Sequence, residues 1–273
     1  MITQSFLTVG GAQIFVRSQG EGEPVLFLHG NPDSSALWMP VFEQLAKSGE
    51  FSGYHCLAPD LPGFGQSNLP ADFSFDKTSL ANFIEQTLDA LAIRTPVTLV
   101  VHDFGGIYGL AFATAYPDLV KRILITNTLF FPDYRWHFLA RLWRMRGVGE
   151  LTMATMNPLA FQLILRLGSR KLTGRMISEI YHDYRPSVRK MVLQLYRAAD
   201  PADFALWEQA YLKIAERIPV RVVWGENDPF IEKEFADRFG TDDVHVLKNC
   251  GHWVPLEEPE RTADLLIALV KTY

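Results

Sequence analysis

Cysteine is scarce in this chain of 273 residues, and long apolar runs are absent. The two cysteines, Cys56 and Cys250, lie far apart and have no second metal-type pair, so they predict neither a disulfide framework nor a zinc site. No apolar run approaches the roughly 18 residues that suggest a membrane-spanning helix. The first residues lack the basic start, apolar core and cleavage site of a signal peptide. We therefore expect a protein of the reducing cytoplasm without a membrane partner.

A surplus of positive charge is also missing. The chain has 26 lysine and arginine residues against 31 acidic ones, which gives a formal net charge of -5. A nucleic-acid-binding protein normally carries an excess of basic residues on one face, so no nucleic-acid partner is expected. With 48% hydrophobic residues, the composition is that of a globular protein with a sizeable core. The sequence leaves the oligomeric state open between a monomer and a small homo-oligomer.

Short apolar runs bounded by turn residues recur along the chain. They are continuous rather than alternating, which is typical of strands covered on both faces. These runs occupy residues 25–30, 54–60, 97–103, 122–128, 220–226 and 244–249, and helical patterns occupy 36–48, 75–93, 105–117 and 257–273. The alternation predicts an α/β fold, a mostly parallel sheet flanked by helices. Residues 8–20 predict an antiparallel hairpin at the edge of that sheet.

The alternation of strand and helix stops after residue 128 and resumes at residue 219. The residues between show helical periodicity, many arginine, tryptophan and tyrosine residues, and no strand pattern. We predict that residues 1–128 and 219–273 form an α/β core. Residues 129–218 then form a helical cap inserted between two strands of that core.

Three polar residues follow predicted strands directly. Asp103, in VHDFGG (101–106), stands between a strand and a helix, where a strand–turn–helix elbow exposes a nucleophile above the sheet. Asp228 lies in WGENDP (224–229) and His252 in CGHW (250–253). Their order, nucleophile, acid and histidine, is that of a hydrolase triad. Because open parallel sheets place their ligands at the carboxyl ends of strands, we predict that the three meet.

Each of these residues also has a simpler interpretation. As a helix N-cap, Asp103 would only accept backbone N–H groups of the following helix, and a lone histidine is often structural. Asp228 would cap a helix that begins near Pro229. Glu226 and Asn227 are neighbouring alternatives to it, whereas Asn127, after an earlier strand, cannot carry the charge of the acid.

The segment HGNPDSS (29–35) follows another predicted strand. Its glycine and proline can set a rigid turn whose backbone N–H faces the nucleophile. We predict that the N–H groups of Asn31 and Phe104 form an oxyanion hole. His29 and Asn31 could equally be turn-forming polar residues.

Five motifs carry a resemblance to a known family. HGNP, DLPGFGQS (60–67), VHDFGG, WGENDP and CGHW, in this order, resemble the α/β-hydrolase superfamily. An aspartate in the elbow is similar to the epoxide hydrolase and haloalkane dehalogenase branches. The resemblance covers the core and implies the α/β-hydrolase fold with a helical cap. We expect no cofactor and no metal. The aromatic-rich cap predicts a mostly apolar pocket between cap and core, for a small organic substrate that reacts with water.

An aspartate nucleophile suggests a particular chemistry. A carboxylate suits displacement at saturated carbon, which produces an alkyl ester on Asp103. His252, oriented by Asp228, then takes a proton from water as a general base. The oxyanion hole acts in this second step, because water attacks the carbonyl carbon of Asp103 itself.

The leaving group separates the branches. An epoxide oxygen needs an acid, which cap tyrosines supply in the epoxide hydrolases that this chain resembles. Tyr196, in LQLYRAAD (193–200), matches that pattern, and Tyr134 is the first choice for a second tyrosine, ahead of Tyr181 and Tyr184. We predict epoxide hydrolysis to a diol.

Dehalogenation is the alternative, for a haloalkane or a haloacid. The dehalogenases that this chain resembles commonly have a tryptophan directly after the nucleophile. Phe104 stands there and offers no side-chain N–H, although Asn31 matches their pattern. Trp136 is the first candidate for a replacement donor, with Trp143 and Trp207 as others. A non-catalytic, ligand-binding protein on the same scaffold is a third hypothesis.

Overall fold

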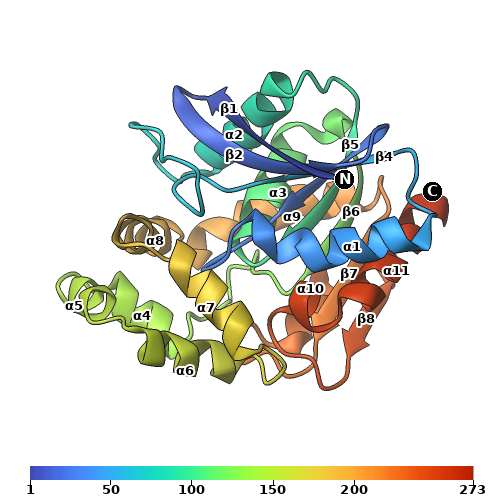
Figure 1. Cartoon of the computed structure of the whole chain (residues 1–273). Helices are drawn as coiled ribbons and strands as arrows, with labels where there is room; N and C mark the ends of the chain where they lie inside the picture. Colours follow the sequence, from blue (N-terminus) through green and yellow to red (C-terminus); the bar gives the residue numbers. More distant parts are fainter. Residues whose placement is uncertain (273) are drawn as a thin grey trace.

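The computed structural model describes residues 1–272, which form a single sheet covered by helices on both faces (Figure 1). The sheet has eight strands in the order β1-β2-β4-β3-β5-β6-β7-β8. The strands are β1 (Ile2–Val9), β2 (Ala12–Gln19), β3 (Glu23–Leu28), β4 (Tyr54–Pro59), β5 (Val97–His102), β6 (Val120–Thr126), β7 (Val220–Gly225) and β8 (Val244–Leu247).

The predicted fold class is confirmed. In sheet order, the six strands β4, β3, β5, β6, β7 and β8 pair in parallel. These are the six parallel strands that the sequence predicts. The hairpin β1–β2 joins β4 in antiparallel register at one edge, as predicted, although it extends from residue 2 to residue 19. Every residue of β5 is buried, which explains why the apolar residues Leu99, Val100 and Val101 follow one another without alternation.

Helices cover the two faces in separate groups. On one face, α1 (Met39–Ser48) packs against α10 (Val254–Glu257) and α11 (Pro259–Thr272). On the other face, α3 (Phe104–Ala115) packs against α2 (Lys77–Ala90) and α9 (Ala205–Ala215). Short 3-10 turns follow β3 at Ser35–Trp38 and β7 at Lys233–Arg238, and another joins α3 to β6 at Pro117–Leu119.

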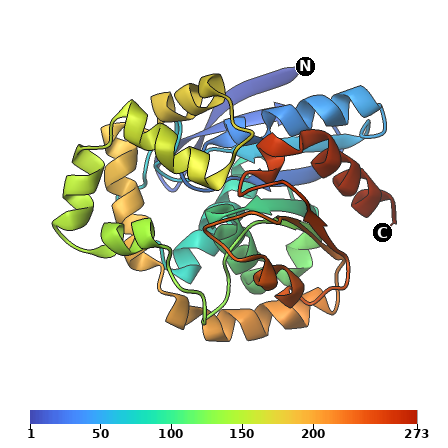
Figure 2. The ribbon, with the colours of Figure 1, turned by 90° about the horizontal axis from the view of Figure 1, so that it is seen from below.

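The segment between β6 and β7 is helical, with no strand in its residues 129–218. It contains α4 (Phe138–Arg144), α5 (Val148–Ala154), α6 (Pro158–Gly168), α7 (Gly174–Asp183), α8 (Pro186–Ala198), a 3-10 turn at Pro201–Phe204, and α9. Figures 1 and 2 show α4 to α8 gathered at one side of the sheet, whereas α9 lies across the sheet beside α3. The division into a core and a 129–218 cap remains a prediction.

Within residues 1–272, no helix is long and apolar enough to cross a membrane.

Candidate active site

Asp103 stands at a tight elbow between β5 and α3. Its φ of 49° lies in the left-handed region, which few residues other than glycine adopt. A Cβ at Gly30 would lie 2.4 Å from the Asp103 Cβ, and one at Gly106 would lie 1.9 Å from the Thr128 Oγ1. A larger residue at Gly30 or at Gly106 would therefore clash with its neighbours. This close packing holds Asp103 in its strained backbone conformation.

The Asp103 carboxylate makes no capping hydrogen bond to α3. Instead its Oδ1 accepts a hydrogen bond from the backbone N–H of Asn31, at 2.8 Å. Burial raises the pKa of Asp103, whereas the His252 charge and the backbone amides of Phe104 and Asn31 act in the opposite direction. The two amides predicted as an oxyanion hole thus face the predicted nucleophile.

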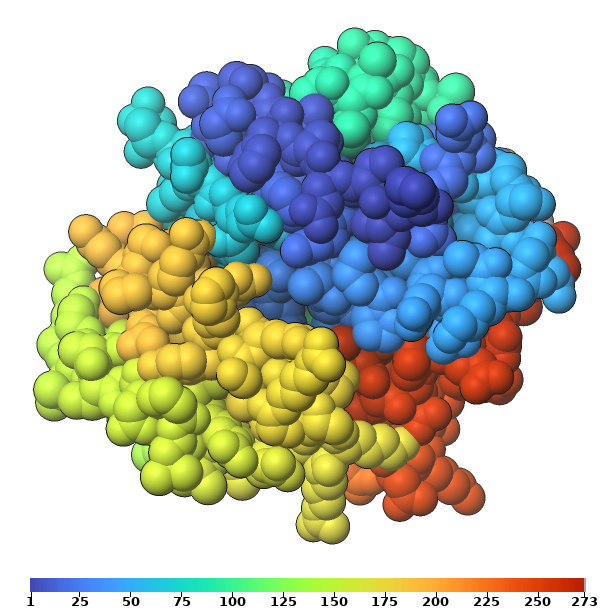
Figure 3. All heavy atoms as spheres, in the orientation of Figure 1, coloured from blue at the N-terminus to red at the C-terminus, as the bar shows by residue number. Residues whose placement is uncertain are grey.

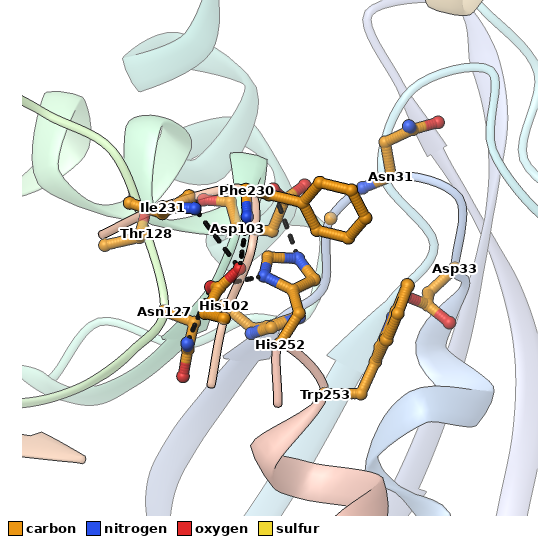
Figure 4. A network of polar contacts seen from close by, with 12 residues as sticks. Asn31, Asp33, His102, Asp103, Asn127, Thr128, Phe230, Ile231, His252 and Trp253 are labelled. Atoms are coloured by element: carbon orange, nitrogen blue, oxygen red, sulfur yellow. Dashed lines mark hydrogen bonds and ion pairs between the residues drawn. The ribbon is translucent and has the colours of Figure 1, made fainter. Parts of the chain in front are cut away.

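Asp228 lies in a turn after β7 and contacts His252. Figure 4 shows the polar network around His252, with Asn127, Phe230 and Ile231. Its Oδ2 lies 2.8 Å from the His252 Nδ1 and accepts a hydrogen bond from the Asn127 side chain, at 2.7 Å. Its Oδ1 accepts the backbone N–H groups of Phe230 and Ile231, at 2.8 and 3.2 Å. The expected helix near Pro229 is not formed, because these amides bind the carboxylate in a turn and helical geometry begins only at Lys233.

The two neighbours of Asp228 do not replace it. The Glu226 carboxylate lies 3.9 Å from the Lys233 ammonium, and the Asn227 backbone N–H donates to the carbonyl of Cys250. Asn127 supports the acid through its amide, and its side-chain oxygen accepts the N–H of Gly225 at 3.1 Å. Sequence reasoning considered Asn127 only as an unsuitable acid and missed this supporting contact.

His252 connects the two carboxylates. Its Nε2 lies 3.6 Å from the Asp103 Oδ2, and its side chain is almost fully buried. Burial alone lowers the pKa of an imidazole, but the charges of Asp228, Asp103 and Asp33 outweigh it and raise the pKa of His252 to about 9. At neutral pH the ring is therefore a cation held between carboxylates.

Other buried polar groups, to which sequence reasoning gave no role, surround His252. The Trp253 indole N–H donates to the Asp33 Oδ2 at 2.8 Å, and burial raises the pKa of Asp33 to about 7. The His102 ring lies 4.8 Å from that of His252, and burial keeps its pKa well below the usual range. Asp33 and Trp253 both belong to motifs that the sequence singled out, but a separation of 220 residues hides their contact.

A mostly apolar cavity lies above Asp103, between the sheet and the inserted helices. Its wall includes Trp136, Trp143, Phe161, Leu165, Tyr196 and Phe230. Aromatic side chains of this kind favour a small apolar ligand. Among residues 1–272, no group of three or more histidine, cysteine or acidic side chains is arranged to hold a metal ion.

Tyr196, the first predicted acid, contacts both residues of the predicted oxyanion hole. Its hydroxyl accepts a long hydrogen bond from the Asn31 side-chain amide, at 3.4 Å, and its ring packs edge-on against Phe104. Burial and the Asp103 charge raise the pKa of Tyr196 well above 10, so the hydroxyl stays protonated.

The other tyrosines have hydroxyl partners elsewhere. Tyr134 lines the cavity, but its hydroxyl donates to the Phe230 carbonyl at 3.0 Å. The Tyr181 hydroxyl donates to the Met156 carbonyl, and the Tyr184 hydroxyl contacts the Met153 sulfur. Tyr184 also lines the cavity, but burial and the Asp103 charge raise the pKa of Tyr134, whereas burial alone raises the pKa of Tyr184, so Tyr134 stays the first choice of the three.

Two of the three candidate tryptophans lie at the cavity, and the third does not. Trp136 and Trp143 line the cavity, and within residues 1–272 the buried indole N–H of Trp136 has no acceptor. Trp207 packs on Phe130 and Phe204, away from this cavity.

The sheet order, the elbow and the inserted helices together define the class of α/β-hydrolase-fold proteins. The chain belongs to the alpha/beta hydrolase family, whose sequence model matches residues 25–265.

The named relatives and solved structures that this chain is similar to carry several different activities. It is 29% identical to a cis-3-alkyl-4-alkyloxetan-2-one decarboxylase of Shewanella oneidensis, over 98% of this chain and 87% of that protein. The Xanthomonas campestris pv. campestris protein of the same name is 30% identical over 93% and 88%. An epoxide hydrolase from Vigna radiata superposes with a TM-score of 0.81 at 20% identity, covering 100% and 98% of the two chains. The haloalkane dehalogenase DatA from Agrobacterium tumefaciens C58 superposes with a TM-score of 0.81 at 26% identity, covering 99% and 97%.

Proposed function

We propose that the protein is a hydrolase in which the Asp103 carboxylate attacks a saturated carbon and becomes an alkyl ester. The observation that carries this proposal is the arrangement of one carboxylate at the elbow, with the Asn31 N–H on its Oδ1 and His252 at 3.6 Å from its Oδ2. Oδ1 is held by the amide, so Oδ2 is the oxygen that forms the new bond. A carboxylate is suited to such a displacement.

His252 acts in the second step. While Asp103 is ionised, its charge helps to keep the imidazole protonated. Alkylation neutralises Asp103, which lowers the pKa of His252 and lets the ring become a base. It then takes a proton from water as that water attacks the ester carbonyl carbon. The amides of Asn31 and Phe104 stabilise the charge that develops on Oδ1, and Asp228 orients the imidazole.

In this proposal the substrate is an epoxide, because Tyr196 can supply the proton that its ring opening requires. Ring opening produces an alkoxide, which needs a proton. The Tyr196 hydroxyl oxygen accepts a hydrogen bond from the Asn31 amide, so the hydroxyl proton is free to point toward the substrate. Burial raises the pKa of Tyr196, so the hydroxyl keeps this proton until the strongly basic alkoxide forms. In the proposed reaction Tyr196 protonates the alkoxide, with Tyr134 as second donor. The resulting phenolate takes up the proton that His252 releases after alkylation, and hydrolysis of the ester frees the diol.

A four-membered lactone is the second candidate, favoured by the two decarboxylases that match nearly the whole chain. Attack by Asp103 at the saturated ring carbon that is bound to the ring oxygen would release the lactone group as a carboxylate. A carboxylate leaving group needs no proton from an acid. Loss of carbon dioxide would then break the new ester bond, return the electrons to Asp103 and leave an alkene. This route consumes no water and makes no use of His252 as a base.

Dehalogenation remains a third proposal, favoured by one observation. The cavity holds the Asn31 amide and the unpartnered indole N–H of Trp136, two groups that can stabilise a departing halide.

Trapping the alkyl-enzyme tests the proposed function. Wild-type protein, Asp103→Asn and His252→Gln are each incubated with an epoxide, an oxetan-2-one and a bromoalkane, and intact masses and products are measured. His252→Gln should gain the mass of the epoxide at Asp103 and stall, whereas Asp103→Asn should gain none. A lactone that reacts by decarboxylation should still release carbon dioxide from His252→Gln. Absence of an adduct and of product with all three substrates would contradict the proposal and favour a ligand-binding role.

A further inference from the structure

The inserted helices expose an unusual share of the large apolar side chains. Within residues 1–272, eleven such side chains are exposed, and six of them lie between residues 138 and 167. We call these six the outer cap surface: Phe138, Met145, Leu151, Leu159, Leu163 and Leu167, each between 52% and 69% exposed. They belong to α4, α5, α6 and the turn after α4, which Figures 1 and 2 show together at one side of the molecule. In Figure 3 this part of the chain, in yellow-green, covers the lower left of the molecular surface. An accumulation of this kind on one side indicates an interaction surface.

Helix α6 is apolar on two opposite faces. Leu159, Leu163 and Leu167 are spaced four residues apart and so share one face, which is exposed. Phe161 and Leu165 lie on the other face and line the cavity above Asp103. A helix that is hydrophobic all round is normally covered on all sides, so the exposed leucine face calls for a partner.

Positive charge accompanies these side chains. From α4 to the residue before α7, positions 138–173 contain six arginine or lysine residues and one acidic residue, Glu150, in a chain with a net charge of -5. Glu150 is itself paired with Arg197. Arg144 and Lys171 also have acidic partners. The other four basic residues are exposed and have no carboxylate partner within residues 1–272: Arg141, Arg146, Arg166 and Arg170.

We propose that the outer cap surface docks on an anionic lipid bilayer. The exposed leucines of α6 enter the headgroup region, and the unpaired arginines contact lipid phosphates. Arg166 lies on the leucine face itself, where its long stem can cover apolar surface while its guanidinium reaches the headgroups. The remaining chain is rich in acidic residues, which an anionic bilayer repels. The bilayer therefore orients the molecule with the outer cap surface and its arginines toward the lipid.

A bilayer fits these observations better than a second copy of the chain. Arginines interspersed with leucines match a surface that offers phosphate and hydrocarbon side by side. Leu139 and Trp143 of α4 and Phe161 and Leu165 of α6 line the cavity above Asp103, so the helices that carry the outer cap surface also enclose the candidate site. The sequence-based expectation of no membrane partner rested on the lack of a spanning segment, which surface docking does not need.

Vesicle co-sedimentation of the intact protein, without substrate, tests this proposal independently of the reaction. Vesicles of phosphatidylglycerol and phosphatidylcholine are compared with vesicles of phosphatidylcholine alone. Wild-type protein should bind the anionic vesicles at low salt and at least about 10-fold more weakly at high salt. Leu159→Gln/Leu163→Gln/Leu167→Gln should abolish binding. Leu206→Gln, which removes an exposed leucine on α9, is the matched control and should bind like wild type.

Charge is tested separately. Arg166→Gln/Arg170→Gln should weaken binding about 10- to 30-fold, whereas Arg261→Gln, at an exposed position on α11, should leave it unchanged. Circular dichroism and thermal melting confirm that each variant is folded. The proposal is overturned if wild-type protein does not bind anionic vesicles, or if the triple leucine variant binds as well as wild type. A concentration-dependent dimer that the triple variant loses, without vesicle binding, would assign the surface to a second copy.

Discussion

Asp103 has two oxygens in different surroundings, and this difference organises the proposed chemistry. Oδ1 accepts the Asn31 N–H, whereas Oδ2 faces His252 at 3.6 Å. The same group therefore has one oxygen ready to react and one ready to bear developing charge. Three predictions concern single side chains of this site.

Tyr196→Phe should slow epoxide ring opening by about 10²–10⁴-fold, because only the proton donor is lost. The rate of adduct formation in a His252→Gln background measures this step alone. Tyr134→Phe should have a smaller effect, since its hydroxyl is bound to the Phe230 carbonyl. A mild effect of Tyr196→Phe, together with faster bromide release by Phe104→Trp, would support dehalogenation instead.

Asp228→Asn should reduce turnover by about 10³–10⁴-fold with little change in fold. Loss of its charge removes the strongest contribution that raises the pKa of His252, and the ring orientation is no longer fixed. Stopped reactions should show accumulated alkyl-enzyme, because only the second step uses His252. Glu226→Gln is the control. A severe effect there with a mild one at Asp228 would reverse the assignment.

Asp33→Asn should change stability in a pH-dependent way. The folded-state pKa of Asp33 is about 7, above its unfolded value near 3.8, so the folded protein holds a proton that the unfolded chain releases. Stability due to this group therefore falls as pH rises from about 4 to 7. Asparagine stays neutral and can still accept the Trp253 N–H.

Thermal unfolding of wild-type protein and Asp33→Asn across pH 4 to 8 checks this sign. The variant should melt about 3–6 °C higher at pH 8 and no higher at pH 4. An equal shift at both pH values would mean that the buried charge is not the cause.

At the scale of elements, the elbow of β5 and α3 departs from ordinary helix preferences. Alanine normally stabilises a helix relative to glycine by about 1 kcal/mol. At Gly106 an added Cβ meets the Thr128 side chain, whereas at Gly174, in the first turn of α7, nothing lies within 4 Å.

Gly106→Ala should therefore destabilise the protein by about 1–3 kcal/mol, and Gly174→Ala should be neutral or stabilising. Denaturant unfolding of both variants measures the difference. If Gly106→Ala were as stable as wild type, the close packing of α3 against the Thr128 segment would not be what holds the elbow.

At the scale of the whole molecule, the inserted helices and the core meet at the loop that carries His252. The His252 backbone N–H donates to the Gly168 carbonyl at the end of α6, at 2.8 Å. A Cβ at Gly168 would lie 2.4 Å from the Trp253 ring and 2.5 Å from the Phe230 ring. The position of α6 and that of His252 are therefore coupled.

Gly168→Ala should lower both stability, by about 1–3 kcal/mol, and the rate of ester hydrolysis, because Trp253 packs directly against His252. Adduct formation by Asp103 should change less than its breakdown. Single-turnover kinetics separate the two steps. Equal losses in both steps would indicate general unfolding of the site rather than displacement of His252.

The sequence alone determined the α/β sheet and the three residues that meet above it. Parallel strands covered on both faces must be continuously apolar, and their carboxyl ends share one edge, so Asp103, Asp228 and His252 can be brought together without knowledge of the packing. The helical character of residues 129–218 followed from periodicity in the same way. Their division into helices over the cavity and α9 against the sheet did not.

Only the tertiary structure decided which side chains support these three residues. The contacts of Asn127 with Asp228, of Trp253 with Asp33 and of His252 with Gly168 join residues far apart in the chain, and each leaves the local pattern unchanged. The same holds for Tyr134, whose hydroxyl partner is a backbone carbonyl that no sequence motif marks. Local patterns reflect the burial of each segment, whereas these contacts depend on how separate segments pack against one another.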